Sequence, residues 1–377
     1  MKELTQKEIW YWLCNLPGIG YKKMTDLLSF YGSARAIYEA ERKQDELILI
    51  GSLNKNDRVM LGRKVESEKI QADYQELVRR GISFYSIDDE EYPLRLKNIY
   101  DPPYGIYVLG RLPEEHSLTI GIVGARNCSN YGKEVASYFA RHLAGAGVQI
   151  ISGLARGIDG YGHEGALAAN GYTLGILGSG VDYCYPKEHI DLYRMMEQKG
   201  GLLSEYGLGV VPKAGNFPRR NRLISAMCDG LLVVEAKERS GSLITVDQAL
   251  EQGKDIFAVP GRICDILSGG TNHLIQMGAE LVIQPSDILK YYQVNTSPED
   301  YKVEQHRALE DMILNSAEKI IFGVLSLELK HVSEIAQESN LNIPILMDSL
   351  FSLVTKGYVV QPVKNYYSKS GRFSVFP

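Results

Sequence analysis

The stretch LTIGIVGAR, at residues 118–126, decides the fold because an uninterrupted apolar run ends there on a glycine-rich turn. Val135, Phe139 and Leu143 then recur at helical spacing before a second apolar run, VQII, at 148–151. Similar runs follow between amphipathic segments: TLGIL (173–177), LLSE (202–205), LLVVE (231–235), IFAV (256–259) and LVI (281–283). This alternation predicts parallel strands joined by crossover helices. We therefore expect an α/β fold with a Rossmann-like, doubly wound and mostly parallel sheet.

Length and composition set outer limits. With 377 residues the chain is long enough for two or three domains. Its five cysteines are scattered without a C-x-x-C pair, which favours a reducing compartment over a disulfide framework or a zinc site. No stretch resembles a signal peptide or a membrane span, so we expect a cytoplasmic protein without membrane association. Because the net charge is −5, a nucleic-acid site must be a local basic patch.

The periodicity predicts further domains on both sides of the sheet. An LPGIG turn at 16–20 lies between two short helices, which fits either a helix-hairpin-helix or an ordinary glycine-rich connection, and no DNA contact is assigned to it. A polar stretch at 293–300 interrupts the pattern and indicates a linker. The expected regions are a small helical domain (1–78), an extended Rossmann-like domain (79–292), a linker (293–308) and a winged-helix-like domain (309–377).

The third helix of the winged-helix-like domain is a poor match for a helix that reads bases. It is expected near 344–356 and carries Asp348, with Lys356 as its single cation near the end. A helix that enters the major groove usually presents several Arg, Lys, Asn or Gln side chains. We therefore favour a protein-contact or structural role for this domain.

Three strand ends are rich in glycine: GIVGAR (121–126), SGLARGID (152–159) and GILGSG (175–180). Glycines at strand-to-helix turns let a phosphate approach backbone N–H groups at a helix N-terminus, although each loop alone could merely close a turn. A dinucleotide site is disfavoured because Gly121 and Gly124 do not form G-x-G-x-x-G, and because the stretch from Arg141 to Ser152 contains no acid to hold a ribose hydroxyl. A P-loop is absent too. We expect an anion-binding rim at the carboxyl ends of the strands, which includes Gly124, Arg126, Gly153, Arg156 and Ser179.

The segment KAGNFPRRNR, at 213–222, carries the strongest local charge and contains no carboxylate. A helix is expected close behind Pro218, so the cations would crowd the positive end of the helix dipole unless an anion binds there. Arginines that follow a backbone and a ring that stacks on bases are typical of single-strand binding. The expected contacts are Phe217, Arg219, Arg220, Asn221 and Arg222, with Lys187 from YPK at 185–187. For Tyr183 and Tyr185, core packing and base stacking stay open.

The ordered motifs resemble those of the DNA-processing protein A family (DprA, also called Smf). They span most of residues 92–290: GAR (124–126), YG (131–132), SGLARGID (152–159) with His163, YPK (185–187), FPRRNR (217–222), VVEA (233–236), SGSLIT (240–245), AVPG (258–261) and GTN (270–272). The resemblance implies a homodimer formed through the Rossmann-like domain, which binds single-stranded DNA and loads a RecA-type recombinase during natural transformation. Ala125 and His189 depart from the serine and asparagine that are common in the family.

A catalytic role has weak support in the sequence. Asp159 and His163 lie four residues apart and could form an acid/base pair or bind a metal, but two groups are few, and structural hydrogen bonding is favoured. The SGS at 240–242 is not a G-x-S-x-G nucleophile elbow. We expect a non-enzymatic protein without a metal or cofactor. The alternative is a Rossmann-like enzyme that acts on a nucleotide or nucleoside phosphate, since the fold alone does not separate the two.

Overall fold

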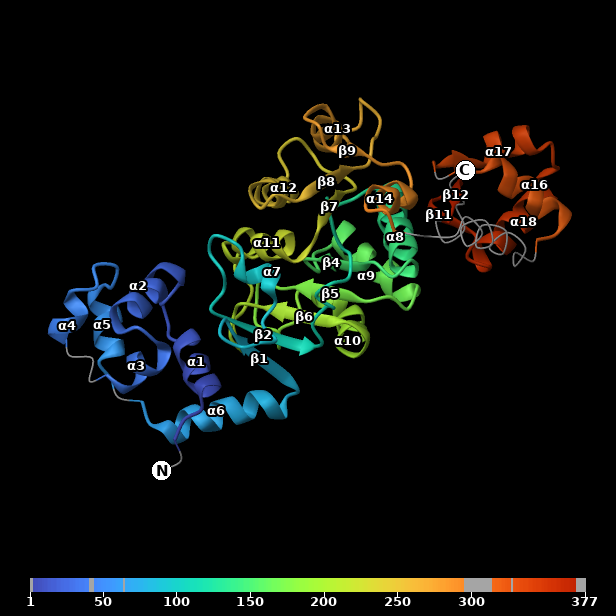
Figure 1. Ribbon diagram of the computed structural model, residues 1–377. Helices are drawn as coiled ribbons and strands as arrows, with labels where there is room; N and C mark the ends of the chain where they lie inside the picture. The colour runs from blue at the N-terminus through green and yellow to red at the C-terminus, as the bar shows by residue number, and fades with distance from the viewer. Residues whose placement is uncertain (1–2, 41–43, 64, 295–313, 327, 371–377) are drawn as a thin grey trace. The chain divides into compact units, whose positions relative to one another are not determined.

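The computed structural model describes residues 3–40, 44–63, 65–294, 314–326 and 328–370 (Figure 1). Its contacts divide the chain into two compact units, one made of residues 1–128 and 136–285 and the other of residues 129–135 and 286–377. The expected linker at 293–308 lies almost entirely outside the described residues, as does the start of the region expected at 309–377.

The first unit begins with six helices: α1 (Gln6–Cys14), α2 (Tyr21–Tyr31), α3 (Ala34–Glu39), α4 (Gln44–Ile48), α5 (Lys55–Leu61) and α6 (Ser67–Arg79). Side chains of α1 pack into one apolar core with residues of the sheet, among them Leu13, Phe84 and Tyr107. Asn15 also donates a hydrogen bond to the Tyr107 hydroxyl at 2.6 Å. The N-terminal helices and the sheet are therefore joined by both apolar and polar contacts.

Among the described residues, the sheet of this unit has nine strands in the order β1-β2-β6-β5-β4-β3-β7-β8-β9. β1 and β2 pair antiparallel at one edge, β2 pairs antiparallel with β6, and the pairs from β6 to β9 are parallel. The expected doubly wound α/β fold is confirmed. The strands are β1 (Ile82–Ser86), β2 (Gly105–Gly110), β3 (Thr119–Val123), β4 (Gln149–Ser152), β5 (Thr173–Ile176), β6 (Gly201–Ser204), β7 (Gly230–Val233), β8 (Asp255–Ala258) and β9 (Glu280–Leu281).

Helices cover both faces of this sheet, which explains why its central strands are apolar at every position. Every residue of β3, β4, β5, β6 and β7 is buried. Right-handed crossovers place α8, α9 and α10 on one face and α11 and α12 on the other, as Figure 1 shows. The helices of this region are α7 (Leu94–Lys97), α8 (Asn130–Gly145), α9 (Ile158–Ala168), α10 (Ile190–Lys199), α11 (Asn216–Met227), α12 (Gly241–Glu251), α13 (Gly269–Gln276) and α14 (Pro285–Tyr291).

The strand order creates a switch point beside β3. From β3 the chain proceeds through β4, β5 and β6 in one direction, and it then returns to place β7 on the other side of β3. The connections that follow β3 and β7 therefore diverge at the carboxyl edge of the sheet. In open α/β sheets such a crevice is where ligands bind.

The second unit contains a small helical domain with an antiparallel sheet of strand order β10-β12-β11. Its elements are α16 (Ser316–Val324), β10 (Lys330–His331), α17 (Val332–Ser339), α18 (Ile343–Thr355), β11 (Val359–Val363) and β12 (Tyr366–Lys369). Ile321, Ile335 and Leu350 are among its fully buried core residues. Three helices followed by a β-hairpin form the winged-helix-like arrangement that the sequence predicts.

Candidate nucleic-acid interface

A pocket of about 660 Å³ lies at the switch point of the sheet. The loops after β3 and β7 and the first turns of α11 and α12 line it. α11 begins at Asn216, so Pro218 occupies the first turn of the helix instead of preceding it. Proline is tolerated there because the first N–H groups of a helix have no partner within it. The basic segment expected to bind an anion therefore begins directly beside the pocket.

Arg126 and two aromatic rings lie together in the lining of this pocket. The Arg126 guanidinium is exposed, and its carbon lies 5.2 Å from the centroid of the Phe217 ring. The Tyr185 ring, 44% exposed, lies 5.6 Å from that of Phe217. Phe217 also packs over Gly178, where a Cβ atom would lie 3.0 Å from the ring. The structure thus brings Arg126, Phe217 and Tyr185 together, as two aromatic faces beside a free cationic head group.

Two cations from the loop after β7 also line the pocket. Lys237 and Arg239 are both exposed and precede α12, whose N-cap residue Ser240 accepts a hydrogen bond from the backbone N–H of Ser242. The sequence analysis did not single out either cation. The sequence does contain a pattern that could have indicated them: AKERSGS, with both cations, directly follows the apolar run at 231–235 and continues into a helix. The positive rim of the pocket is therefore wider than the segment at 213–222.

Arg220 is buried beneath the pocket. Its guanidinium donates to the carbonyl oxygen of Gly153 at 2.7 Å and also to that of Ile176, which ties the ends of β4 and β5 together. A Cβ atom at position 153 would lie 2.6 Å from this guanidinium, so Gly153 is needed here for the close approach of an arginine. Burial lowers the pKa of Arg220 to about 10. Asp159, also buried, accepts from the backbone N–H of Gly153 at 3.2 Å.

Arg222 is also buried, and two carboxylates hold it. It pairs with Glu205 at 2.8 Å and with Asp101 at 2.9 Å. The segment at 213–222 contains no acidic residue, but the fold brings these two from the end of β6 and from the loop before β2. Arg219, three residues earlier, is exposed. The basic segment therefore divides into exposed and buried cations.

The remaining expected residues have different surroundings. Gly124 and Asn221 line the pocket. Lys187 is exposed in the short 3-10 helix Lys187–His189, outside the lining of the pocket. Arg156 is exposed but forms a two-point ion pair with Glu188, one contact of which measures 3.0 Å. Ser179 is buried and donates a hydrogen bond to the carbonyl oxygen of Tyr183 at 3.2 Å.

Asp159 and His163 do not form an acid/base pair with each other in this structure. His163 is fully buried, with Nδ1 at 2.6 Å from the Thr173 hydroxyl. Burial lowers the pKa of His163 to about 3, so the ring is neutral, and burial raises the pKa of Asp159. Over the part of the chain that is described, no three His, Cys, Asp or Glu side chains are grouped to hold a metal ion.

Comparison with known proteins identifies the family. The sequence model described as DNA recombination-mediator protein A matches residues 83–293, which is more than half of the chain. The chain belongs to the DNA recombination-mediator protein A family. It is 41% identical over 223 residues to the DNA processing protein DprA of Bacillus subtilis, a match that covers 59% of this chain and 74% of the relative. The expected membership in the DprA/Smf family is thereby confirmed.

Solved structures of the DNA recombination-mediator protein A family agree with the fold. DprA from Streptococcus pneumoniae aligns with a TM-score of 0.66 and 33% identity, over 77% of this chain and 98% of that one. DNA processing protein A from Helicobacter pylori, whose single-stranded DNA binding mode has been described, aligns with a TM-score of 0.51 and 29% identity, over 56% of this chain and 95% of that one.

Within the described residues, no helix combines the length and apolar character needed to cross a bilayer.

Proposed function

We propose that this protein binds single-stranded DNA at the switch-point pocket. The observation that carries the proposal is the exposed Arg126 guanidinium beside the Phe217 ring, with Lys237 and Arg239 on the same rim. Cations that follow a phosphate backbone beside rings that stack on bases are the usual means of binding single strands without strong sequence preference. Membership in the family and the strand binding of the Helicobacter pylori relative support the same conclusion.

We assign the expected binding residues to two roles according to their exposure and to the contacts that they already make within the fold. Arg126, Lys187, Phe217, Arg219 and Asn221 are proposed to contact the strand. A second set shapes the binding surface from beneath, through hydrogen bonds, ion pairs or close packing: Gly124, Gly153, Ser179, Arg220 and Arg222. Arg156 can contact a phosphate only after Glu188 releases it.

We propose that binding, and no chemical reaction, is the task of this pocket. Asp159 lines it, but its carboxylate is already engaged by backbone N–H groups of the loop after β4. An enzyme that acts on a nucleotide phosphate would instead hold a mononucleotide tightly. In a competition assay at low salt, we expect labelled oligo-dT to bind and a mononucleotide to displace it poorly. Absent oligo-dT binding together with tight mononucleotide binding would favour the enzyme.

We further propose that the protein is a homodimer that joins through the Rossmann-like domain. Large apolar side chains are exposed on β9, the edge strand, and on the segments next to it: Ile263 (98%), Ile266 (73%), Met277 (75%) and Leu281 (50%). A group of exposed apolar side chains on one edge favours contact with another protein surface. We expect Met277→Lys to shift the protein from dimer to monomer in light scattering, while a dimer that persists would exclude this edge.

We propose that the bound strand is then transferred to a RecA-type recombinase during natural transformation. The family's description as a recombination mediator supports this step. The test measures recombinase filament nucleation on single strands coated with single-strand binding protein, with and without this chain. We expect faster nucleation with the chain, and equal rates would leave DNA binding intact but remove the mediator role.

A further inference from the structure

Tyr100 lies in the loop between α7 and β2, and its side chain is 95% exposed. The backbone around it is held on both sides. The Tyr21 hydroxyl donates to the Tyr100 carbonyl oxygen at 3.0 Å, and the next residue, Asp101, pairs with Arg222 at 2.9 Å. The loop therefore presents an aromatic ring to solvent from an anchored position.

This loop belongs to the same edge of the sheet as the pocket. It leads into β2, and β2 runs antiparallel to β6, so the start of β2 lies at the carboxyl end of β6. The helix that precedes the loop, α7, packs against α11. Arg222, the partner of Asp101, lies one helical turn after the exposed Arg219. Within α11, Arg219 therefore lies between Phe217, whose ring is in the pocket, and Arg222, which pairs with the Tyr100 loop.

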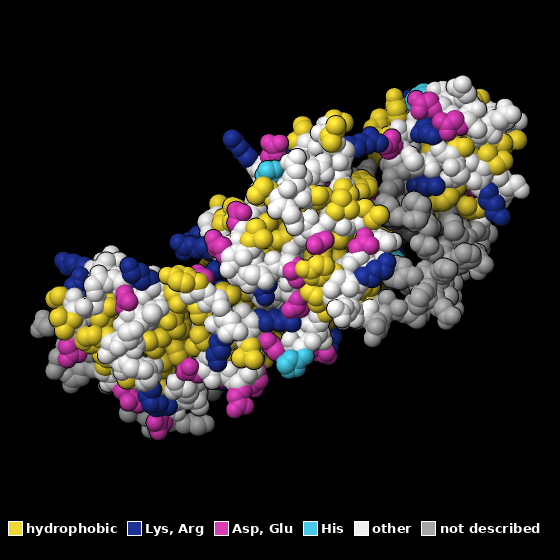
Figure 2. Space-filling view, turned by 45° about the horizontal axis from the view of Figure 1, so that its top comes forward, with side chains coloured by type: hydrophobic (Ala, Val, Ile, Leu, Met, Phe, Trp, Pro, Cys, Tyr) yellow, Lys and Arg dark blue, Asp and Glu magenta, His cyan; other side chains and the backbone are white. Residues whose placement is uncertain are grey.

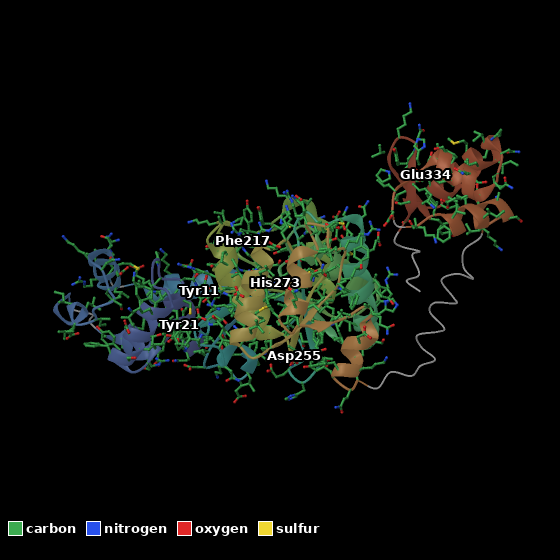
Figure 3. All side chains as sticks on the ribbon, turned by 90° about the horizontal axis from the view of Figure 1, so that it is seen from above. Tyr11, Tyr21, Phe217, Asp255, His273 and Glu334 are labelled. Atoms are coloured by element: carbon green, nitrogen blue, oxygen red, sulfur yellow. The ribbon has the colours of Figure 1, made fainter. Side chains whose placement is uncertain are left out.

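A line of aromatic residues continues from this loop to the N-terminal helices. The Tyr21 and Tyr104 rings stack with centroids 5.6 Å apart, and the Tyr104 ring stacks on Trp10 at 5.9 Å. The Tyr104 hydroxyl lies 2.9 Å from that of Thr25. These contacts hold both ends of the loop, at positions 100 and 104, against α1 and α2. Figure 3 shows Tyr21 among the N-terminal helices and Phe217 on the α/β part of the same unit.

We propose that Tyr100 is a second stacking position for the single strand, reached after the strand leaves the pocket and passes Lys213 and Arg219. The proposal rests on the proposed function, since it extends that binding site. A base can stack on an exposed ring, while the exposed cations between the two positions contact the intervening phosphates. Two acidic groups next to this path, Asp101 and Glu205, are paired with Arg222 and so repel the strand less.

A nucleic-acid strand fits this surface better than a protein partner does. Lys97, on the helix that leads into the Tyr100 loop, is exposed, as are Lys213 and Arg219 on the segment that carries Arg222, the partner of Asp101. Protein interfaces are depleted of lysine, whereas single-strand sites combine lysine and arginine with separated aromatic rings. On the face that Figure 2 presents, Lys and Arg side chains are interspersed with Asp and Glu side chains.

The test compares short and long oligo-dT with the full chain and with Tyr100→Ala and Tyr100→Phe. A strand of about 6 nucleotides occupies the pocket alone, and one of about 25 nucleotides also reaches Tyr100. We expect Tyr100→Ala to weaken binding of the long strand roughly fivefold and to leave the short strand unchanged, because one stacking contact is lost. Tyr100→Phe keeps the ring and should retain the affinity. Leu49→Ala, at a site 72% exposed on the N-terminal helices, serves as the matched control.

Equal affinity of Tyr100→Ala and the unchanged chain for the long strand would overturn the inference. A protein that binds neither strand, in any variant, would instead refute the proposed function. A second measurement uses long strands that carry 5-iododeoxyuridine, with photocrosslinks mapped by mass spectrometry. We expect a crosslink at Tyr100 from the long strand and not from the short one. A crosslink pattern confined to the pocket with both strands would also overturn the inference.

Discussion

The four arginines of this region fall into two pairs that differ in burial: Arg126 and Arg219 on the one hand, and Arg220 and Arg222 on the other. The first two are exposed, and Arg126 lines the switch-point pocket. The other two are at least nine-tenths buried. Arg220 donates hydrogen bonds to backbone carbonyls, and Arg222 forms ion pairs with two carboxylates. Three of these four arginines lie within four positions of one helix. A cluster of cations in a sequence is therefore not the same as a cluster on a surface.

The position of α11 explains the difference. The helix contacts the sheet at β3, β4 and β5 and also packs against α7 and α12, so most of its circumference is covered. Buried guanidinium groups remain stable only with hydrogen-bonding partners, which the strand ends and Glu205 supply. Arg219 is in the first turn, where the helix emerges beside the pocket. We expect substitutions of the buried pair to affect folding and those of the exposed pair to affect DNA binding.

The largest effect is expected for Arg222→Ala. The substitution removes a buried guanidinium and leaves Glu205, whose side chain is 27% exposed, without its cation. We expect a loss of roughly 2–3 kcal/mol of unfolding free energy, less than for a fully buried ion pair. Urea denaturation followed by circular dichroism measures it. Arg219→Ala, one turn earlier and exposed, is the control and should change stability by no more than about 0.5 kcal/mol. Similar losses for both variants would erase the distinction between the two sets.

His163, which is also buried, should make the stability of the protein depend on pH. Its pKa is about 3 in the folded protein, below the unfolded value of about 6.5, so between these values the unfolded chain binds a proton that the folded chain does not. Stability should therefore be full above about pH 6.5 and fall by about 1.4 kcal/mol per unit as the pH drops toward 3. His163→Gln should remove that contribution. Parallel pH profiles of the two proteins in urea unfolding would contradict the buried, neutral state.

How far the sequence could predict the site follows from the same contrast. Strand ends with glycine and arginine predict the carboxyl edge of the sheet as the binding region, because parallel topology fixes which ends meet. The sequence could not predict that Arg220 and Arg222 are buried, because their partners come from distant segments. These partners are Glu205, Asp101 and the Gly153 carbonyl. Gly153 shows the limit most clearly. A glycine at a strand end fits a phosphate and an arginine side chain equally well until the contacts are known.

Arg126→Ala should have an intermediate effect, on binding alone. We expect roughly tenfold weaker binding of oligo-dT at low salt and a salt dependence whose slope is shallower by about 0.7, the value for one phosphate contact on a single strand. Fluorescence anisotropy across a salt series measures both. Thermal unfolding should be unchanged because the side chain is exposed.

Arg141→Ala provides the matched control for Arg126. Arg141 is also exposed, but it lies near the end of α8. This helix leads to the start of β4, at the edge of the sheet opposite to the carboxyl ends of the strands. Its removal should leave both the affinity and the salt slope unchanged. An unchanged slope in Arg126→Ala, or an equal change in Arg141→Ala, would mean that the strand does not bind at the switch point.

The smallest effect on DNA binding is expected in the second unit, at Lys356. Its ammonium group pairs at 2.6 Å with Glu318, which is fully buried and also accepts from the Ser352 hydroxyl at 2.6 Å. Lys356 thus resembles Arg222 in having a carboxylate partner, although its own side chain is 36% exposed. Lys356→Gln keeps a hydrogen-bond donor for Glu318, so the domain should stay folded and oligo-dT affinity should remain within about twofold. A large loss of affinity would show that the end of α18 contacts DNA, and a carboxylate partner would then not be enough to keep a cation from the strand.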